Sequence, residues 1–155
     1  MSLKVGDQAP DFKLYNSEKQ EVNLADYRGK NVVVLFFPLA FTSVCTAELC
    51  QMRDDINTYK NLNSDVVAIS VDSLFTLGKF KEEQQLPFPL LSDFNKETSQ
   101  AFGSYYEDFA FGMHGVSKRS AFVVDKDGII RYAEVLEKAS DVPDFAAIKS
   151  TLESL

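Results

Sequence analysis

An apolar run passes directly into a helical pattern in the segment Val32-Val-Val-Leu-Phe-Phe-Pro-Leu-Ala-Phe-Thr-Ser-Val-Cys-Thr-Ala-Glu-Leu-Cys50. The uninterrupted apolar residues up to Phe37 predict a strand that is buried on both faces of a sheet, as in parallel sheets. Pro38 has no N–H to donate to a neighbouring strand, so we expect the strand to end there. After Thr42 the apolar positions recur at steps of four and three, as in an amphipathic helix. These positions are Cys45, Leu49, Met52, Ile56 and Tyr59.

The junction between this strand and this helix is a place where open α/β sheets build their sites. We expect Thr42 to be the N-cap, with its hydroxyl within reach of the backbone N–H of Cys45. Cys45 then lies in the first helical turn, where unpaired N–H groups and the helix dipole favour a negative charge. Such a position, with a cation nearby, favours the nucleophilic thiolate. Position alone is equally compatible with a small core residue, because free cysteines are often buried.

The segment closely resembles the peroxiredoxin signature Pro-x-x-x-Thr-x-x-Cys, which Pro38, Thr42 and Cys45 match position for position. Arg119 corresponds to the family's active-site arginine. The most similar subgroups are the alkyl hydroperoxide reductase E-like enzymes and the bacterioferritin-comigratory (PrxQ) type. The resemblance spans nearly the whole chain and argues against a purely structural role for Cys45. The other matching segments are Val5–Phe12, Leu24–Lys30 and Lys118–Asp125.

The resemblance implies a thiol peroxidase in which the Cys45 thiolate attacks a peroxide and becomes a sulfenic acid. Thr42 and Arg119 would then donate hydrogen bonds toward the sulfur or the peroxide oxygens, and Pro38 would shield the sulfur from water. Without the resemblance, a surface salt bridge is the ordinary interpretation of Arg119. Glu48 either holds an arginine in place or only favours the start of the helix through its charge.

Cys50 matches the offset of the resolving cysteine in the PrxQ type, so the resemblance implies an intramolecular disulfide that a thioredoxin-like donor reduces. The alternative is a one-cysteine enzyme that uses an outside thiol, with Cys50 a bystander. Residues five apart in an ideal helix differ by ~140° in azimuth and ~7.5 Å in rise. Their Cα atoms then lie more than ~8 Å apart, beyond the ~7 Å limit for a disulfide. Pairing Cys45 with Cys50 therefore requires the helix to unwind locally.

Other uses of the cysteines fit the sequence less well. A thiol–disulfide oxidoreductase acting on proteins would favour a Cys-x-x-Cys spacing, which this chain lacks. A non-enzymatic peroxide sensor, which passes its oxidation to a partner protein, is a further alternative. The two cysteines and His114 have no paired spacing for zinc, and we expect His114 to be exposed. The resemblance implies no metal, haem or flavin.

Periodicity along the chain predicts an α/β protein with one central mixed sheet and helices on both faces. The resemblance specifies a thioredoxin-like fold with an N-terminal β-hairpin, as a single domain over residues 1–155. Residues 104–117 are predicted to be a loop with an apolar centre. The predicted strands and extended segments are 11–24 (a hairpin), 32–37, 65–72, 87–93, 121–125 and 129–135. The predicted helices run from Cys45 to about Leu62, and over 73–85, 96–102 and 142–155.

Charge and composition limit the partners. The net charge of −7 argues against nucleic acid or an anionic membrane surface. We see neither a signal core nor an apolar run long enough to span a bilayer, and two cysteines suggest a reducing compartment, so we expect a cytoplasmic protein. The resemblance implies a peroxide substrate, a thioredoxin-like or small-thiol reductant, and a monomer or homodimer. Phe109, Phe111 and Met113 either form a dimer contact or fold back onto the core.

Overall fold

The structure is a computed structural model that describes residues 3–155. Its centre is a seven-stranded sheet in the order β2-β1-β5-β4-β3-β8-β9. Strands β3, β4 and β5 are mutually parallel, whereas β1, β8 and β9 pair antiparallel with their neighbours, so the sheet is mixed as predicted. The strands are β1 (Lys13–Asn16), β2 (Glu21–Asn23), β3 (Asn31–Phe36), β4 (Ser64–Ser70), β5 (Leu90–Ser92), β8 (Ser120–Val124) and β9 (Ile130–Val135).

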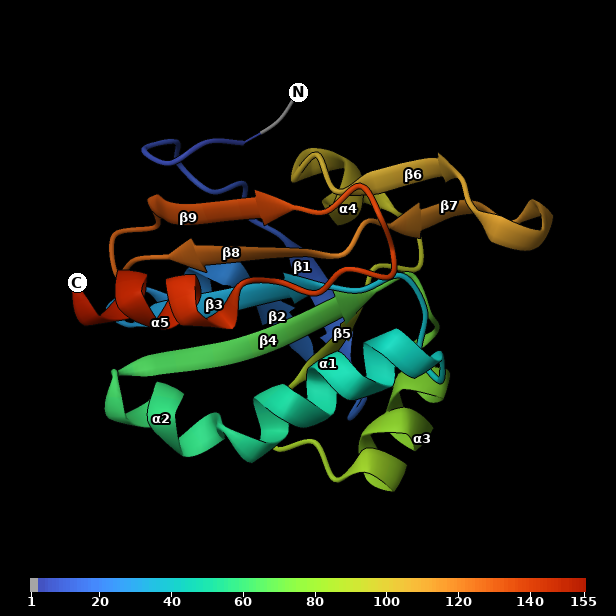
Figure 1. Ribbon diagram of the computed structural model, residues 1–155, viewed down its shortest axis with the longest axis horizontal. Helices are drawn as coiled ribbons and strands as arrows, with labels where there is room; N and C mark the ends of the chain where they lie inside the picture. The colour runs from blue at the N-terminus through green and yellow to red at the C-terminus, as the bar shows by residue number, and fades with distance from the viewer. Residues whose placement is uncertain (1–2) are drawn as a thin grey trace.

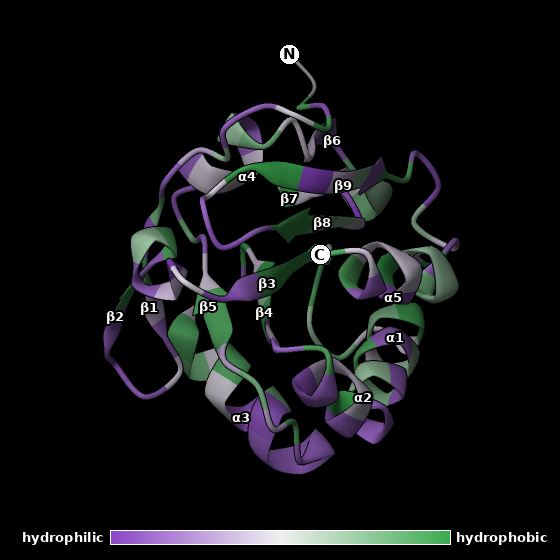
Figure 2. Cartoon of the chain, turned by 90° about the vertical axis from the view of Figure 1, so that its left-hand side faces the viewer, coloured by the Kyte–Doolittle hydropathy of each residue, from purple (hydrophilic) through white to green (hydrophobic). Residues whose placement is uncertain are grey.

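Helices cover both faces of the sheet (Figure 1). One face carries α1 (Ser43–Asp54), α2 (Ile56–Asn61), α3 (Leu74–Gln84) and α5 (Phe145–Glu153). The short helix α4 (Glu97–Ala101), the N-terminal segment and the 3₁₀ turn η1 (Leu24–Tyr27) lie over the other. Figure 2 shows the same layers, with apolar strands between the two sets of helices. This arrangement is the predicted thioredoxin-like fold. None of the helices in residues 3–155 combines the length and apolar character that a membrane-spanning segment requires.

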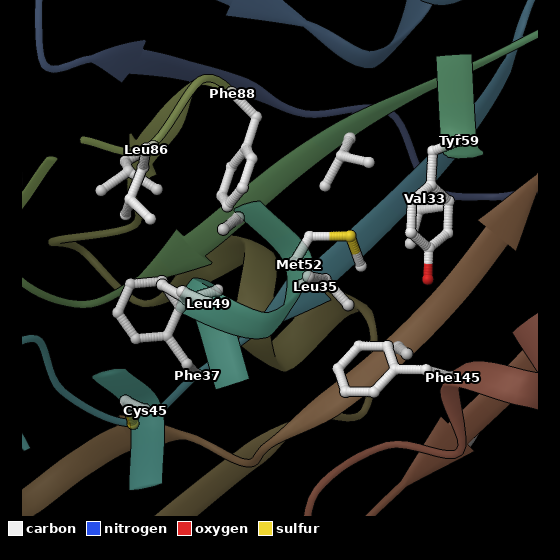
Figure 3. Close-up of a cluster of buried hydrophobic side chains, with 14 of the residues drawn as sticks. Val33, Leu35, Phe37, Cys45, Leu49, Met52, Tyr59, Leu86, Phe88 and Phe145 are labelled. Carbon is white, nitrogen blue, oxygen red and sulfur yellow. The ribbon is translucent and has the colours of Figure 1, made fainter. Parts of the chain in front are cut away.

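Strand β3 belongs to both hydrophobic layers because successive side chains point to opposite faces. Val33, Leu35 and Phe37 lie in the core beneath α1, whereas Val32, Val34 and Phe36 lie in the core beneath α4. Each fully buried side chain of this kind contributes about 1.5–3 kcal/mol. The core beneath α1 also holds Cys45 and the next turns of the helix (Figure 3). The apolar run and the helix after it therefore bury against each other, as their patterns predict.

Most predicted elements are present. The N-terminal hairpin pairs β1 with β2, and β8 pairs with β9 through the predicted Asp-Gly turn. Ser73 caps α3 by accepting a hydrogen bond from the backbone N–H of Thr76. The predicted strands and helices after β4 begin and end within a few residues of their observed bounds.

Two predictions about secondary structure were wrong. The helix after Cys45 does not run unbroken to Leu62, because Asp55 (φ −107°, ψ 8°) separates α1 from α2. The Asp55 carboxylate accepts from Thr58 and pairs with Lys149 of α5, and these contacts compete with a continuous helix. The predicted loop 104–117 instead forms the hairpin β6 (Tyr105–Asp108) and β7 (His114–Ser117), joined by the 3₁₀ turn η2 (Ala110–Gly112). Hydrogen bonds between serine hydroxyls hold the base of this hairpin. Ser99 bonds to Ser117, and Ser104 bonds to Ser120.

Candidate active site

A cavity of about 210 Å³ opens at the N-terminus of α1. It brings together Pro38, Thr42, Cys45 and Arg119, all of which the sequence singled out. Phe109, from the loop after β6, and Ala139, from the connection between β9 and α5, complete much of the wall. Cys45 is buried, so it forms the floor of this cavity. A larger hollow of about 600 Å³ lies beside β1 and α4, but neither cysteine nor Arg119 lines it.

The loop from Pro38 to Thr42 is held by a hydrogen bond to Asp72, which lies just after β4 and is itself fixed by Ser70. The backbone N–H of Ala40 donates to Asp72 Oδ2 across 2.8 Å, and the Ser70 hydroxyl donates to the same oxygen across 2.6 Å. Phe41 adopts a left-handed conformation with φ 67°, and its ring packs edge-on against Phe80 of α3, with the ring centroids 5.1 Å apart. A non-glycine residue in this conformation stores strain, which the surrounding contacts must offset. The loop therefore reaches α1 in one fixed geometry.

Thr42 is the N-cap of α1 by its backbone angles, as predicted, but its hydroxyl does not cap the helix. The hydroxyl instead donates a hydrogen bond to the carbonyl oxygen of Leu39, 2.8 Å away. The expected contact, in which the hydroxyl oxygen accepts from the N–H of Cys45, is therefore wrong: no side-chain hydrogen bond caps α1. A hydroxyl has a single proton, so Thr42 can only accept a further hydrogen bond. The first N–H groups of α1 are left without a side-chain cap and are available to an anion or a peroxide oxygen.

Arg119 is nearly fully buried, with 2% of its surface exposed, which overturns its ordinary interpretation as a surface ion pair. Its Nη1 donates to Glu48 Oε1 across 2.6 Å. Its Nε and Nη2 both donate to the carbonyl oxygen of Ala139, across 3.2 and 3.0 Å. Burial by itself lowers the pKa of Arg119, but the charges of Glu48 and then Cys45 outweigh it and hold that pKa above its ordinary value. The guanidinium is thus a permanent charge with a fixed orientation at the cavity wall.

Glu48 lies on α1, pairs with Arg119 and is fully buried. Of the two interpretations from the sequence, contact with an arginine is therefore the one that the geometry fits. Burial raises the pKa of Glu48 from 4.5 to about 7, and this exceeds the lowering by Arg119. The second oxygen, Oε2, has no hydrogen-bond partner among the described residues. An unpaired buried oxygen disfavours the carboxylate, which agrees with the raised pKa.

Cys50 does not line the cavity. It lies further along the intact helix α1, half-buried, and both cysteines are free thiols. His114 is exposed, as predicted, and pairs with Asp108 across 2.7 Å at the tip of the β6–β7 hairpin. Residues 3–155 contain no group of three or more acidic, histidine or cysteine side chains that could hold a metal ion.

Comparison with known proteins identifies the family. The sequence profile of the AhpC/TSA family matches residues 5–133. Alkyl hydroperoxide reductase E of Mycobacterium tuberculosis is 45% identical over 136 residues, which are 86% of this chain and 86% of that protein. This chain is a peroxiredoxin of the AhpC/TSA family. It is therefore a thiol-dependent peroxidase.

Other peroxiredoxins agree with this assignment. Peroxiredoxin Bcp of Bacillus subtilis is 36% identical over 129 residues, 83% of this chain and 82% of that protein. The crystal structure of the peroxidoxin BcpB from Mycobacterium tuberculosis has a TM-score of 0.87 at 28% identity and covers 99% of this chain and 98% of its own. PrxQ of Xylella fastidiosa has a TM-score of 0.87 at 23% identity, with 99% and 98% covered, and shares the fold.

Sequence reasoning missed three parts of this peroxiredoxin site. Asp72 anchors the loop before α1, the carbonyl oxygen of Ala139 orients Arg119, and the Phe109 side chain forms an apolar wall. Asp72 had a detectable signal, because it lies two residues after a buried strand, at the edge where α/β sheets place their sites. A backbone carbonyl such as that of Ala139 leaves no signal in the side chains of a sequence.

Proposed function

We propose that Cys45 is the residue that peroxide oxidises, and that hydrogen peroxide and organic hydroperoxides are the substrates. The Cys45 thiolate attacks one peroxide oxygen, a sulfur–oxygen bond forms, and the oxygen–oxygen bond breaks. The sulfur is oxidised to a sulfenic acid, and the departing oxygen leaves as hydroxide or alkoxide and takes up a proton. The observation that carries the proposal is the buried Arg119 guanidinium beside Cys45, at the open start of a helix.

The other residues of the cavity have complementary tasks in this reaction. Arg119 and the first N–H groups of α1 donate toward the oxygens, where negative charge grows as the bond breaks. Thr42 accepts the hydrogen bond from the peroxide O–H, because its own proton is already used by Leu39. Pro38 shields the sulfur, since it has no N–H to bind water. Pro38, Val44 and Phe109 give the cavity an apolar wall that fits an alkyl group, which supports organic hydroperoxides as substrates.

We further propose that Cys50 resolves the sulfenic acid. The Cys50 sulfur attacks the Cys45 sulfur, a disulfide forms, the sulfur–oxygen bond breaks, and water leaves with the proton of the thiol. Two thiols of a thioredoxin-like donor then exchange with this disulfide and become oxidised themselves. The step needs α1 to unwind between the cysteines.

One observation favours a second candidate. Cys50 lies outside the cavity and can reach Cys45 only after α1 unwinds, so an outside small thiol could reach the sulfenic acid at Cys45 first. In that case the enzyme would use one cysteine, and Cys50 would be a bystander.

Intact mass and free-thiol counts after one equivalent of hydrogen peroxide separate these candidates. We expect wild type to lose both thiols with a mass decrease of about 2 Da, and Cys50→Ser to gain about 16 Da instead. A gain of about 16 Da in both proteins would establish the one-cysteine enzyme. Cys45→Ser is the control, and a peroxide reaction that survives this substitution would sink the assignment of Cys45.

The oligomeric state and the cellular location of the protein are further proposals. We propose a monomer or homodimer in the cytoplasm, because a reducing compartment keeps the two thiols available. Phe111 is 97% exposed at the tip of the β6–β7 hairpin, and a second copy of the chain could cover this apolar side chain. Sedimentation equilibrium over a wide concentration range distinguishes the two states.

A further inference from the structure

The Cys50 side chain is hydrogen-bonded to Gln84, the last residue of α3. Its thiol donates to the side-chain oxygen Oε1 of Gln84 across 3.3 Å. Three residues further along α1, Arg53 donates from Nη1 to the backbone carbonyl oxygen of the same glutamine across 2.7 Å. Residues three apart share one face of a helix. Two side chains on that face of α1 therefore contact the same residue at the end of α3.

These contacts oppose the motion that resolution requires. In an ideal helix the Cα atoms of Cys45 and Cys50 lie more than ~8 Å apart, beyond the ~7 Å limit for a disulfide. Cys50 must therefore leave Gln84 while α1 unwinds. The contact exists only in the folded helix, so it lowers the population of the unwound form.

We propose that Gln84 is a positioning residue that holds Cys50 away from Cys45 and so sets how long the sulfenic acid persists. This proposal rests on the resolution by Cys50 proposed above. The chemistry of the step is unchanged by Gln84: the disulfide forms and water leaves as already described. Gln84 acts earlier, on the fraction of molecules in which Cys50 is free to move.

The proposal has a consequence for damage by excess peroxide. A sulfenic acid that waits for Cys50 can react with a second peroxide, which transfers one oxygen and leaves as water or an alcohol. The product is a sulfinic acid, which cannot form the disulfide. Removing the Gln84 contact should therefore speed resolution and protect Cys45 from this second oxidation.

Rapid-quench intact mass spectrometry tests the proposal on the full chain with hydrogen peroxide. The gain of about 16 Da reports the sulfenic acid, and its conversion to a mass decrease of about 2 Da reports the disulfide. We expect Gln84→Leu to speed the second step about two- to ten-fold, the effect of losing one ordinary hydrogen bond. The first step depends on peroxide concentration and should keep its rate, because Gln84 does not touch the cavity.

Two further variants distinguish positioning from a general loss of structure. Gln84→Glu keeps an acceptor of nearly the same shape, and we expect it to keep the slow second step. Arg53→Met removes the other contact to the same residue and should also speed the second step. Glu82→Ala changes an exposed residue of the same helix and should leave both steps unchanged.

The outcomes separate the two proposals. If wild type forms no species about 2 Da lighter, resolution by Cys50 is wrong, and the role of Gln84 falls with it. If wild type forms that species and Gln84→Leu forms it at the same rate, only the role of Gln84 is wrong. Equal acceleration in Gln84→Leu and Gln84→Glu would also overturn the role of Gln84, because the acceptor would then not matter.

Discussion

At the scale of single residues, the orientation of Arg119 is the feature on which the proposed chemistry most depends. Its contacts with Glu48 and the Ala139 carbonyl fix the plane of the guanidinium at the cavity wall. We predict that Arg119→Met, which keeps most of the volume and removes the charge, slows oxidation of Cys45 about a hundred-fold, as for loss of one preorganised donor. Loss of the Cys45 thiol after mixing with hydrogen peroxide measures the rate.

The neighbouring residue supplies a matched control for this prediction. Lys118 lies outside the cavity and pairs with Glu137 at the surface. Lys118→Met removes one charge from the same strand connection and should leave the rate of Cys45 oxidation within about two-fold. Equal slowing by both substitutions would mean that net charge, and not the placement of Arg119, drives the reaction.

Glu48 makes stability depend on pH. Its pKa is raised by burial from 4.5 to about 7, so between these values the folded protein binds a proton that the unfolded chain releases. The stabilisation is fully present below pH 4.5 and is lost as the pH rises through 7. We predict that wild type loses about 2 to 3 kcal/mol between about pH 5 and about pH 8 relative to Glu48→Gln, which cannot titrate.

Urea unfolding of both proteins at the two pH values measures this difference. The titrating groups away from Glu48 are common to wild type and Glu48→Gln, so their contributions cancel in the comparison. An identical pH dependence in the two proteins would show that Glu48 is ionised throughout this range.

At the scale of elements, helix α1 carries both cysteines and must change if they pair. We predict that residues 46–52 exchange their amide hydrogens at least about ten-fold faster in the peroxide-oxidised protein than in the reduced one, because the disulfide cannot form on an intact helix. Helix α3 should keep its protection. Hydrogen exchange read by mass spectrometry provides the measurement.

Cys50→Ser is the control for this prediction, since it retains the oxidised Cys45 and cannot form the disulfide. Its helix α1 should remain protected after peroxide treatment. Unchanged protection of α1 in a wild-type protein that has lost about 2 Da would show that the helix accommodates the disulfide without unwinding.

At the scale of the whole molecule, the two hydrophobic layers share one sheet and should unfold together. Val33 and Val34 are adjacent in β3, are both fully buried, and belong to opposite layers. We predict that Val33→Ala and Val34→Ala each lower the free energy of unfolding by about 2 kcal/mol and shift the entire transition. Circular dichroism and tyrosine fluorescence in urea should give coincident curves for each variant. Separate transitions would refute the prediction of a single domain over residues 1–155.

The local sequence determined much of this protein. The apolar run of β3, the helical spacing after Thr42 and the Asp-Gly turn before β9 are each encoded in a short stretch of the chain. These patterns predict secondary structure and a mixed sheet because strand and helix periodicities depend on short-range geometry. Cys45 could be placed at the start of a helix for the same reason, and its resemblance to the peroxiredoxin signature was confirmed by the family comparison.

Only the tertiary structure decided the surroundings of Cys45. Glu48 and Arg119 are 71 residues apart in the chain, and they meet because α1 packs against the connection between β7 and β8. The Cys50 thiol donates to Gln84, 34 residues away in the chain, because the fold brings that acceptor within reach. The predicted loop became β6 and β7 through contacts among distant serines. Burial and hydrogen-bond partners depend on segments that meet only when the chain folds, so residue spacing alone does not specify them.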